Sequence, residues 1–181
     1  DDECRNFLVE SKQRSKFMEQ FKLHEGMGWS LIRVPAGNAM DAKQYLISQG
    51  IDEHNIFILG NSLSGVPEDQ LSTIDRFKKD FEDAQLFGDK LVAITVAGCR
   101  AGINFGAMMK NNLISTWDST VASVAAVVQA NVGRACGYHG NNTSIHFTNG
   151  NAAEAYGATL DYLERTCADH AASDFDGLKE F

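Results

Sequence analysis

The chain has 181 residues, of which 44% are hydrophobic, and it carries a formal net charge of −8. This length suits one well-packed domain, and the acidic charge excludes a protein that coats nucleic acid through overall charge, while leaving room for a local groove. No apolar run approaches the roughly 20 residues of a membrane span, and the polar N-terminus is unlike a signal peptide, so we expect a cytoplasmic protein with no membrane partner.

Apolar residues recur with a pattern that predicts alternating helices and strands. In the first half of the chain we expect a helix over 6–25, a strand over 29–34, a helix over 38–50, a strand over 55–60 and a helix from 68, with Leu71, Ile74, Phe77 and Phe81 facing inward. In the second half we expect strands over 90–96 and 113–116, a helix from near 119, a strand over 143–148 and a last helix, with Tyr156, Leu160, Leu163 and Cys167 in line. This order predicts an open, mainly parallel α/β sheet with helices on both faces.

The four cysteines indicate neither a zinc site nor a disulfide framework. They are widely spread, none forms a C-x-x-C pair, and no histidine cluster lies beside them. We expect buried free thiols and no bound metal.

Two glycine-rich segments carry the candidate chemistry, because ligands of such sheets bind outside the carboxyl ends of the strands. "TVAGCRAGINFG" begins with Thr95 at a strand end, and its small residues would let backbone N–H groups approach a phosphate. In "VVQANVGRACGYHG", Arg134 follows Gly133, and Gly137 and Gly140 come after it. The glycines of either segment alone would also serve a tight turn, but two glycine-flanked basic sites together favour phosphate binding.

The ordered set of segments resembles a known family. "LVAITVAGCRAGINFG" and "VVQANVGRACGYHG" resemble motifs V and VI of the second RecA-like domain of superfamily-two helicases. Upstream, "WSLIRVPAGNAMDAKQYLISQGI" is similar to the motif IV strand and its helix, and "IDRFKKDFEDAQLFGDKLVAITV" to the stretch that leads to motif V. The resemblance covers about residues 28–150, and it points to a divergent, phage-like member.

The resemblance implies roles for individual residues. Thr95 would hold the nucleic-acid backbone, and Gly102 would be the motif V glycine, with Asn104 at the position that faces the nucleotide. Gly133 and Arg134 match the Gly-Arg pair of motif VI, so Arg134 would be a catalytic arginine finger that stabilises charge on the γ-phosphate of ATP. The nucleic-acid track would pass near residues 35–38, 60–65 and 95–100, which include Pro35, Asn61 and Arg100.

Three positions depart from the family pattern. The second arginine of motif VI is replaced by Gly137, and the glutamine before its glycine stands one place early, as Gln129, with Ala130 in register. Asn104 replaces an acidic residue. We interpret these departures as divergence and keep Gln129 among the nucleotide-binding candidates.

The sequence lacks G-x-x-x-x-G-K-[ST], so no loop in it can cradle the β- and γ-phosphates. We therefore expect a fragment of a longer enzyme: ATP and Mg²⁺ would be bound chiefly by an absent N-terminal RecA-like lobe, and the chain alone would not hydrolyse ATP. We expect an N-terminal helix over 1–27, the RecA-like domain over 28–168 and an acidic tail over 169–181.

The expected function is the C-terminal motor lobe of an ATP-dependent helicase or translocase, monomeric, with DNA favoured over RNA as its partner. The alternative is a stand-alone nucleotide- or phosphate-binding module without motor activity. Two further alternatives are a purely structural interaction domain and an enzyme in which Cys136 and His139 form a catalytic thiol pair.

Overall fold

The computed structural model describes residues 4–84, 86–96, 105–118 and 143–148, together with 150, 154, 155, 157, 158, 161, 162 and 165. Its elements are α1 (Lys12–Leu23), β1 (Gly28–Val34), α2 (Ala39–Ser48), the 3₁₀ turn η1 (Glu53–Asn55), β2 (Ile56–Leu59), the 3₁₀ turn η2 (Glu68–Gln70), β3 (Leu71–Ser72), α3 (Ile74–Ala84), β4 (Lys90–Val96), α4 (Gly106–Asn111), β5 (Leu113–Asp118) and β6 (Ile145–Thr148).

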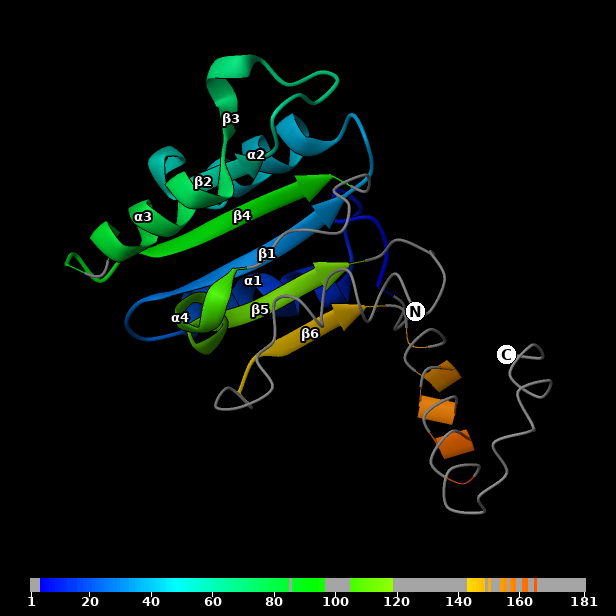
Figure 1. Cartoon of the computed structure of the whole chain (residues 1–181). Helices are drawn as coiled ribbons and strands as arrows, with labels where there is room; N and C mark the ends of the chain where they lie inside the picture. The colour runs from blue at the N-terminus through cyan, green and yellow to red at the C-terminus, as the bar shows by residue number, and fades with distance from the viewer. Residues whose placement is uncertain are drawn as a thin grey trace.

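The strands form one open six-stranded sheet in the order β3-β2-β4-β1-β5-β6, and every neighbouring pair is parallel (Figure 1). The predicted α/β fold class is therefore confirmed. Because all strands run the same way, their carboxyl ends lie at one edge of the sheet, and we call this the carboxyl edge; the opposite edge is the amino edge.

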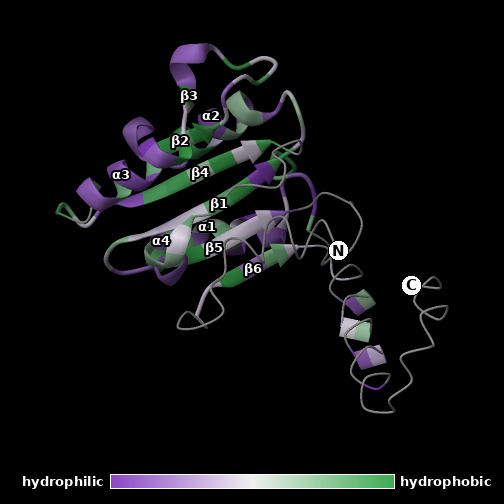
Figure 2. Cartoon of the chain, viewed as in Figure 1, coloured by the Kyte–Doolittle hydropathy of each residue, from purple (hydrophilic) through white to green (hydrophobic). Residues whose placement is uncertain are grey.

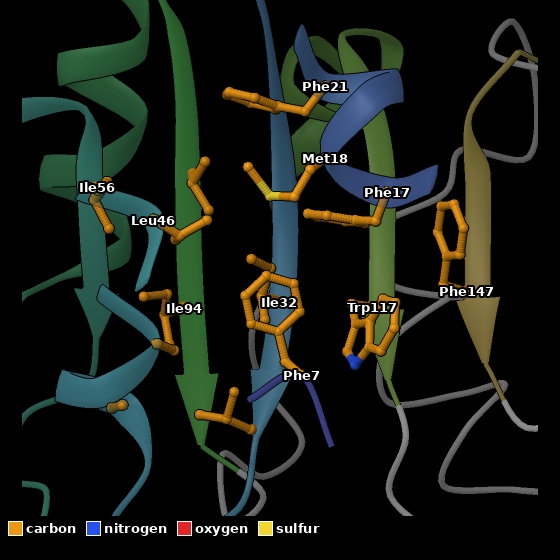
Figure 3. Close-up of a cluster of buried hydrophobic side chains, with 14 of the residues drawn as sticks. Phe7, Phe17, Met18, Phe21, Ile32, Leu46, Ile56, Ile94, Trp117 and Phe147 are labelled. Carbon is orange, nitrogen blue, oxygen red and sulfur yellow. The ribbon is translucent and has the colours of Figure 1, made fainter. Parts of the chain in front are cut away.

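Helices α1 and α2 cover one face of the sheet. Phe17, Met18 and Phe21 of α1 and Leu46 of α2 pack with Ile32 and the other apolar side chains that β1, β2, β4, β5 and β6 direct to this face (Figure 3). Its centre is aromatic: the rings of Phe7, Phe17, Trp117 and Phe147 meet at centroid distances of 5.4 to 5.9 Å. The N-terminal helix thus shares its core with the sheet.

Helices α3 and α4 cover the other face. Phe77 and Phe81 of α3 and Met109 of α4 pack with Trp29 and Leu31 of β1, and all five side chains are almost fully buried. The indole Nε1 of Trp29 donates a hydrogen bond of 2.6 Å to the Met109 carbonyl and so ties α4 to the sheet. Figure 2 shows the hydropathy of these elements, with mostly hydrophilic residues in α3 and mostly hydrophobic residues in β2 and β4.

The predicted strands and the first two helices are confirmed, with shifted ends. The first helix begins only at Lys12, because the side chain of Ser11 accepts a hydrogen bond from the backbone N–H of Arg14 and caps it. The strand predicted over 113–116 continues to Asp118. The helix predicted from 119 lies outside the described residues, whereas the described residues of the last predicted helix are helical.

Two predictions of the connections were wrong. Leu71 does not begin the third helix: Leu71 and Ser72 form β3 beside β2, and α3 starts at Ile74. Between the strands predicted over 90–96 and 113–116 lies α4, which the sequence pattern did not indicate. Among the described residues, no helix combines the length and apolar character that crossing a membrane requires.

Candidate functional site at the carboxyl edge of the sheet

The connections of β1 and β4 leave the sheet toward opposite faces. The two strands are neighbours in register from Gly28↔Lys90 to Val34↔Val96. After β1 the chain enters α2, and after β4 it leads to α4, which packs on the opposite face. This arrangement is a topological switch point, and in open parallel sheets the crevice outside such a point is the usual ligand site. The candidate site therefore lies at the carboxyl ends of β1 and β4.

The residues that directly follow β1, β2 and β4 include no acid, although the chain carries an excess of acids; farther along, the connection from β2 to β3 holds Glu68 and Asp69 in η2. The three directly following segments read "PAGN" over 35–38, "GNSLSGV" over 60–66 and "AGCRAGIN" over 97–104, and their strands are adjacent in the order β2-β4-β1. The first acid after β1 is Asp41, inside α2. The segments that precede the same strands contain four acids: Glu25, Asp52, Glu53 and Asp89. The residues at the ends of β1, β2 and β4 are therefore less negative on the carboxyl side of the sheet than on the amino side.

A row of polar side chains crosses the sheet at this edge. Thr95 of β4 is the register partner of Arg33 in β1, Arg33 is the partner of Asp118 in β5, and Asp118 is the partner of Thr148 in β6. Register partners share a face, and here it is the face that α3 and α4 cover, because the next residues along the strands, such as Ile32 and Ile94, belong to the opposite core.

Arg33 and Asp118 form an ion pair within this row. A guanidinium nitrogen of Arg33 donates to a carboxylate oxygen of Asp118 at 3.1 Å, and the two side chains are 11% and 1% exposed. Next to them, the hydroxyl of Thr148 is buried and has no hydrogen-bond partner among the described residues. The pair fixes the Arg33 side chain at the end of β1, between Thr95 on β4 and Asp118 on β5.

The N-terminal segment also reaches the carboxyl edge. The carbonyl of Arg5 accepts a hydrogen bond of 3.1 Å from the indole of Trp117, and the Asn6 amide donates to the Asn38 side chain at 3.4 Å. Cys4 is buried there as a free thiol, as predicted; burial and then the charge of Asp118 raise its pKa to about 12, so it is not a nucleophile at neutral pH.

His146 is a second titratable group near this row, in β6. Its imidazole lies 2.8 Å from the hydroxyl of Thr116 and 3.2 Å from that of Ser144, and both hydroxyls can donate or accept to suit either tautomer. Burial lowers the pKa of His146, which favours the neutral ring. Among the described residues, no group of three or more His, Cys, Asp or Glu side chains is placed to hold a metal ion.

Three of the predicted site residues fall in the described part of the chain. Thr95 is 5% exposed in the next-to-last position of β4, Pro35 directly follows β1, and Asn61 is exposed two residues after β2. The sheet order brings the ends of these three strands together. The remaining candidates lie outside the described residues: Arg100, Gly102, Asn104, Gln129, Gly133 and Arg134.

Sequence reasoning did not single out Arg33, Asp118 or Thr148. One signal was available: Arg33 is the charged residue of a mainly apolar strand, "WSLIRV", and such a residue needs a partner when the strand is central. Comparisons of the chain with models of protein families, with curated proteins and with solved structures found no match. The class defined so far is an α/β domain with an open, all-parallel six-stranded sheet.

Proposed function

We propose that this chain is the C-terminal motor lobe of an ATP-dependent helicase or translocase, which holds the phosphate backbone of nucleic acid at its carboxyl edge. The observation that carries the proposal is the acid-free set of small-residue segments at three adjacent strand ends, β2, β4 and β1. Backbone N–H groups and short polar side chains can approach phosphates there without meeting a carboxylate.

The resemblance to superfamily-two helicases supports the same site. The segment similar to motif IV forms β1 and α2, and the segment similar to the approach to motif V forms α3 and β4. Both segments therefore end or turn at the switch point. In the proposal, Thr95 contacts the nucleic-acid backbone, and Pro35 and Asn61 border the same track.

The ATP site is proposed as a half-site. A partner lobe would bind ATP with Mg²⁺, and Arg134 would reach the γ-phosphate from this lobe. The position of Arg5 and Asn6 at the carboxyl edge supports this arrangement, because a lobe joined ahead of the N-terminal segment would lie over that edge. The amino edge, with its four acids, would face away from the nucleic acid.

A matched pair of charge substitutions tests the nucleic-acid track on the chain itself. Asn61 and Asn55 lie at opposite ends of β2, so Asn61→Asp adds a negative charge at the carboxyl edge and Asn55→Asp adds one at the amino edge. We expect binding of a labelled single-stranded oligonucleotide, measured by fluorescence anisotropy, to weaken several-fold in Asn61→Asp and to stay within about twofold in Asn55→Asp. Equal affinities of the two variants would remove the track from this edge.

Thr95→Ala probes the backbone contact, with the exposed Ser15→Ala on α1 as its control. Loss of a phosphate contact should weaken binding uniformly across oligonucleotide sequences. An unchanged affinity in Thr95→Ala would take Thr95 out of the proposed groove.

The half-site is tested by ATP hydrolysis. The isolated chain should show no turnover stimulated by nucleic acid, and Arg134→Ala in the two-lobed enzyme should lower kcat by about 10³-fold or more while ATP affinity falls much less. Arg134→Lys should rescue little, because lysine lacks the planar fork of the guanidinium. Turnover by the isolated chain that depends on Arg134 would overturn the two-lobe model.

The second candidate function is a stand-alone nucleotide- or phosphate-binding module. The switch point between β1 and β4 favours it, since this crevice binds small ligands in many open sheets. It predicts that the isolated chain binds ATP or inorganic phosphate measurably by calorimetry and needs no partner lobe, whereas the motor-lobe proposal predicts weak or no ATP binding.

A further inference from the structure

A groove runs along the outermost strands at one side of the sheet, β3 and β2. Strand β3 has two residues, and within the described part of the chain it pairs with Ile58 and Leu59 of β2 alone. The first half of β2, Ile56 and Phe57, pairs with β4 on its inner side, and β3 does not extend far enough to pair with its outer side. A groove of about 530 Å³ lies along this stretch, between η1, β3 and α3.

One wall of the groove is closed by a buried lysine. The Lys43 ammonium, on a side chain 7% exposed, donates to the Gln70 side chain at 2.7 Å and lies 3.3 Å from a carboxylate oxygen of Glu53. These contacts fix η2 beside α2 and η1. These contacts therefore fix the position of one wall of the groove.

An exposed apolar pair stands at the other end. Leu86 and Phe87, in the turn between α3 and β4, are 82% and 79% exposed, and Phe87 lines the groove. Two adjacent large apolar side chains with this exposure form a small apolar surface beside the groove. They offer an anchor for an apolar side chain of a partner.

The charge of the groove selects the partner. Its lining includes five carboxylates, from Glu53, Asp69, Asp80, Asp83 and Asp89, and two cations, Lys43 and Arg76. Both cations already contact carboxylates within the groove, since Arg76 lies 3.7 Å from Asp80 and Lys43 pairs with Glu53. Nucleic acid is repelled by this lining, and so is a second copy of a chain with a net charge of −8.

We propose that this groove, defined by the β2–β3 edge, the Asp80–Asp89 turn region and Phe87, binds an extended, basic segment of a partner protein. Lysine or arginine side chains of the segment would meet Asp83 and Asp89 at the rim, and an apolar side chain would pack on Phe87. The inference is independent of the proposed motor function, because the groove lies at the amino half of the sheet, away from the segments that follow β1 and β4.

The test measures binding of a fluorescein-labelled octapeptide of alternating lysine and valine to the full chain by anisotropy. The same peptide with glutamate in place of lysine is the charge control. The groove variants are Asp83→Asn with Asp89→Asn, and Phe87→Ser; all three side chains are exposed, so their loss should leave folding intact. The matched controls on α1 and its approach are Glu10→Gln with Glu19→Gln, and the exposed Leu23→Ser.

We expect saturable binding of the basic peptide that weakens about tenfold in the double aspartate variant and about fivefold in Phe87→Ser, with the controls within about twofold. The oligonucleotide affinity should be the same in all these variants. Absence of saturable binding, equal binding of the acidic peptide, or equal losses in the groove and control variants would each overturn the proposal.

Discussion

Lys90 connects the start of β4 to the end of α1. Its ammonium donates hydrogen bonds to the carbonyls of Phe21, Lys22 and His24 at 2.6, 2.9 and 2.9 Å, and it lies 5.2 Å from the centroid of the Phe21 ring. The last carbonyls of a helix have no partner within the helix and carry its negative dipole end. The lysine thus caps α1 from a strand that lies almost seventy residues later in the chain.

Lys90→Met keeps the apolar stem and removes the charged donor. A hydrogen bond to a charged group contributes about 1.5–3 kcal/mol, but the three bonds share one ammonium, whose desolvation and lost side-chain freedom offset part of the gain. We therefore expect the free energy of unfolding to fall by about 2–3 kcal/mol. For a chain of this size, that corresponds to a decrease in Tm of about 4–12 °C.

The assay is urea unfolding followed by far-ultraviolet circular dichroism, with Lys22→Met as the control. Lys22 is exposed at the same helix end, so its loss removes a dipole interaction and leaves the three hydrogen bonds of Lys90 in place. The control should lose less than about 0.5 kcal/mol. If the two variants lose the same free energy of unfolding, the hydrogen bonds of Lys90 contribute nothing beyond the interaction of a positive charge with the helix end.

The ion pair of Arg33, the imidazole of His146 and the thiol of Cys4 each give one further prediction. Asp118→Asn leaves Arg33 mostly buried without its carboxylate, so urea unfolding should show a loss of about 3–5 kcal/mol; a loss typical of an exposed pair would contradict the buried geometry. Because burial lowers the pKa of His146, its contribution to stability is complete above its ordinary pKa of about 6.5 and lost as the pH falls through the lower folded value, so His146→Gln should flatten the stability curve below about pH 6.5, and superimposable curves would refute this. With its pKa raised to about 12, Cys4 should be alkylated by iodoacetamide roughly 10³-fold more slowly in the folded than in the urea-unfolded chain, as measured by mass spectrometry of its peptide; similar rates would contradict its burial.

The parts of the fold that follow from apolar pattern were predictable, and the parts set by single contacts were not. The central strand over 90–96 is a continuous apolar run, and its predicted bounds match β4. Leu71 fits the helical spacing to Ile74 equally well, so the pattern could not show that the Thr73 hydroxyl accepts from the Arg76 N–H and starts the helix after it. Helix α4 has too few residues for a periodic signal, although β4 and β5 are parallel strands on either side of β1, and parallel strands need a crossover connection.

The same distinction separates the predicted from the missed site residues. Thr95 was predictable because it stands at the end of a recognisable strand. The pairing of Arg33 with Asp118 depends on the register of β1 and β5, which shifts between Trp29 and Ser30. A slip of one residue would place the two side chains on opposite faces, and nothing in a sequence of apolar and polar letters specifies that shift.

The acids of α3 are placed where helix energetics disfavour them. Asp80, Glu82 and Asp83 lie toward its C-terminal end, and its last turn holds no basic residue. A negative charge near the C-terminus of a helix loses about 0.3–1 kcal/mol relative to a positive one, so several carboxylates there reduce stability, and the ion pair of Arg76 with Asp80 offsets part of this loss. Charges that lower stability persist where they are neutral to selection, and also where a function needs them. The groove beside β2 provides such a need, because these carboxylates give it the charge that selects a basic segment. Neutralising Asp83 should accordingly raise the free energy of unfolding while it weakens peptide binding, and this opposition distinguishes a binding surface from a merely solvated helix end.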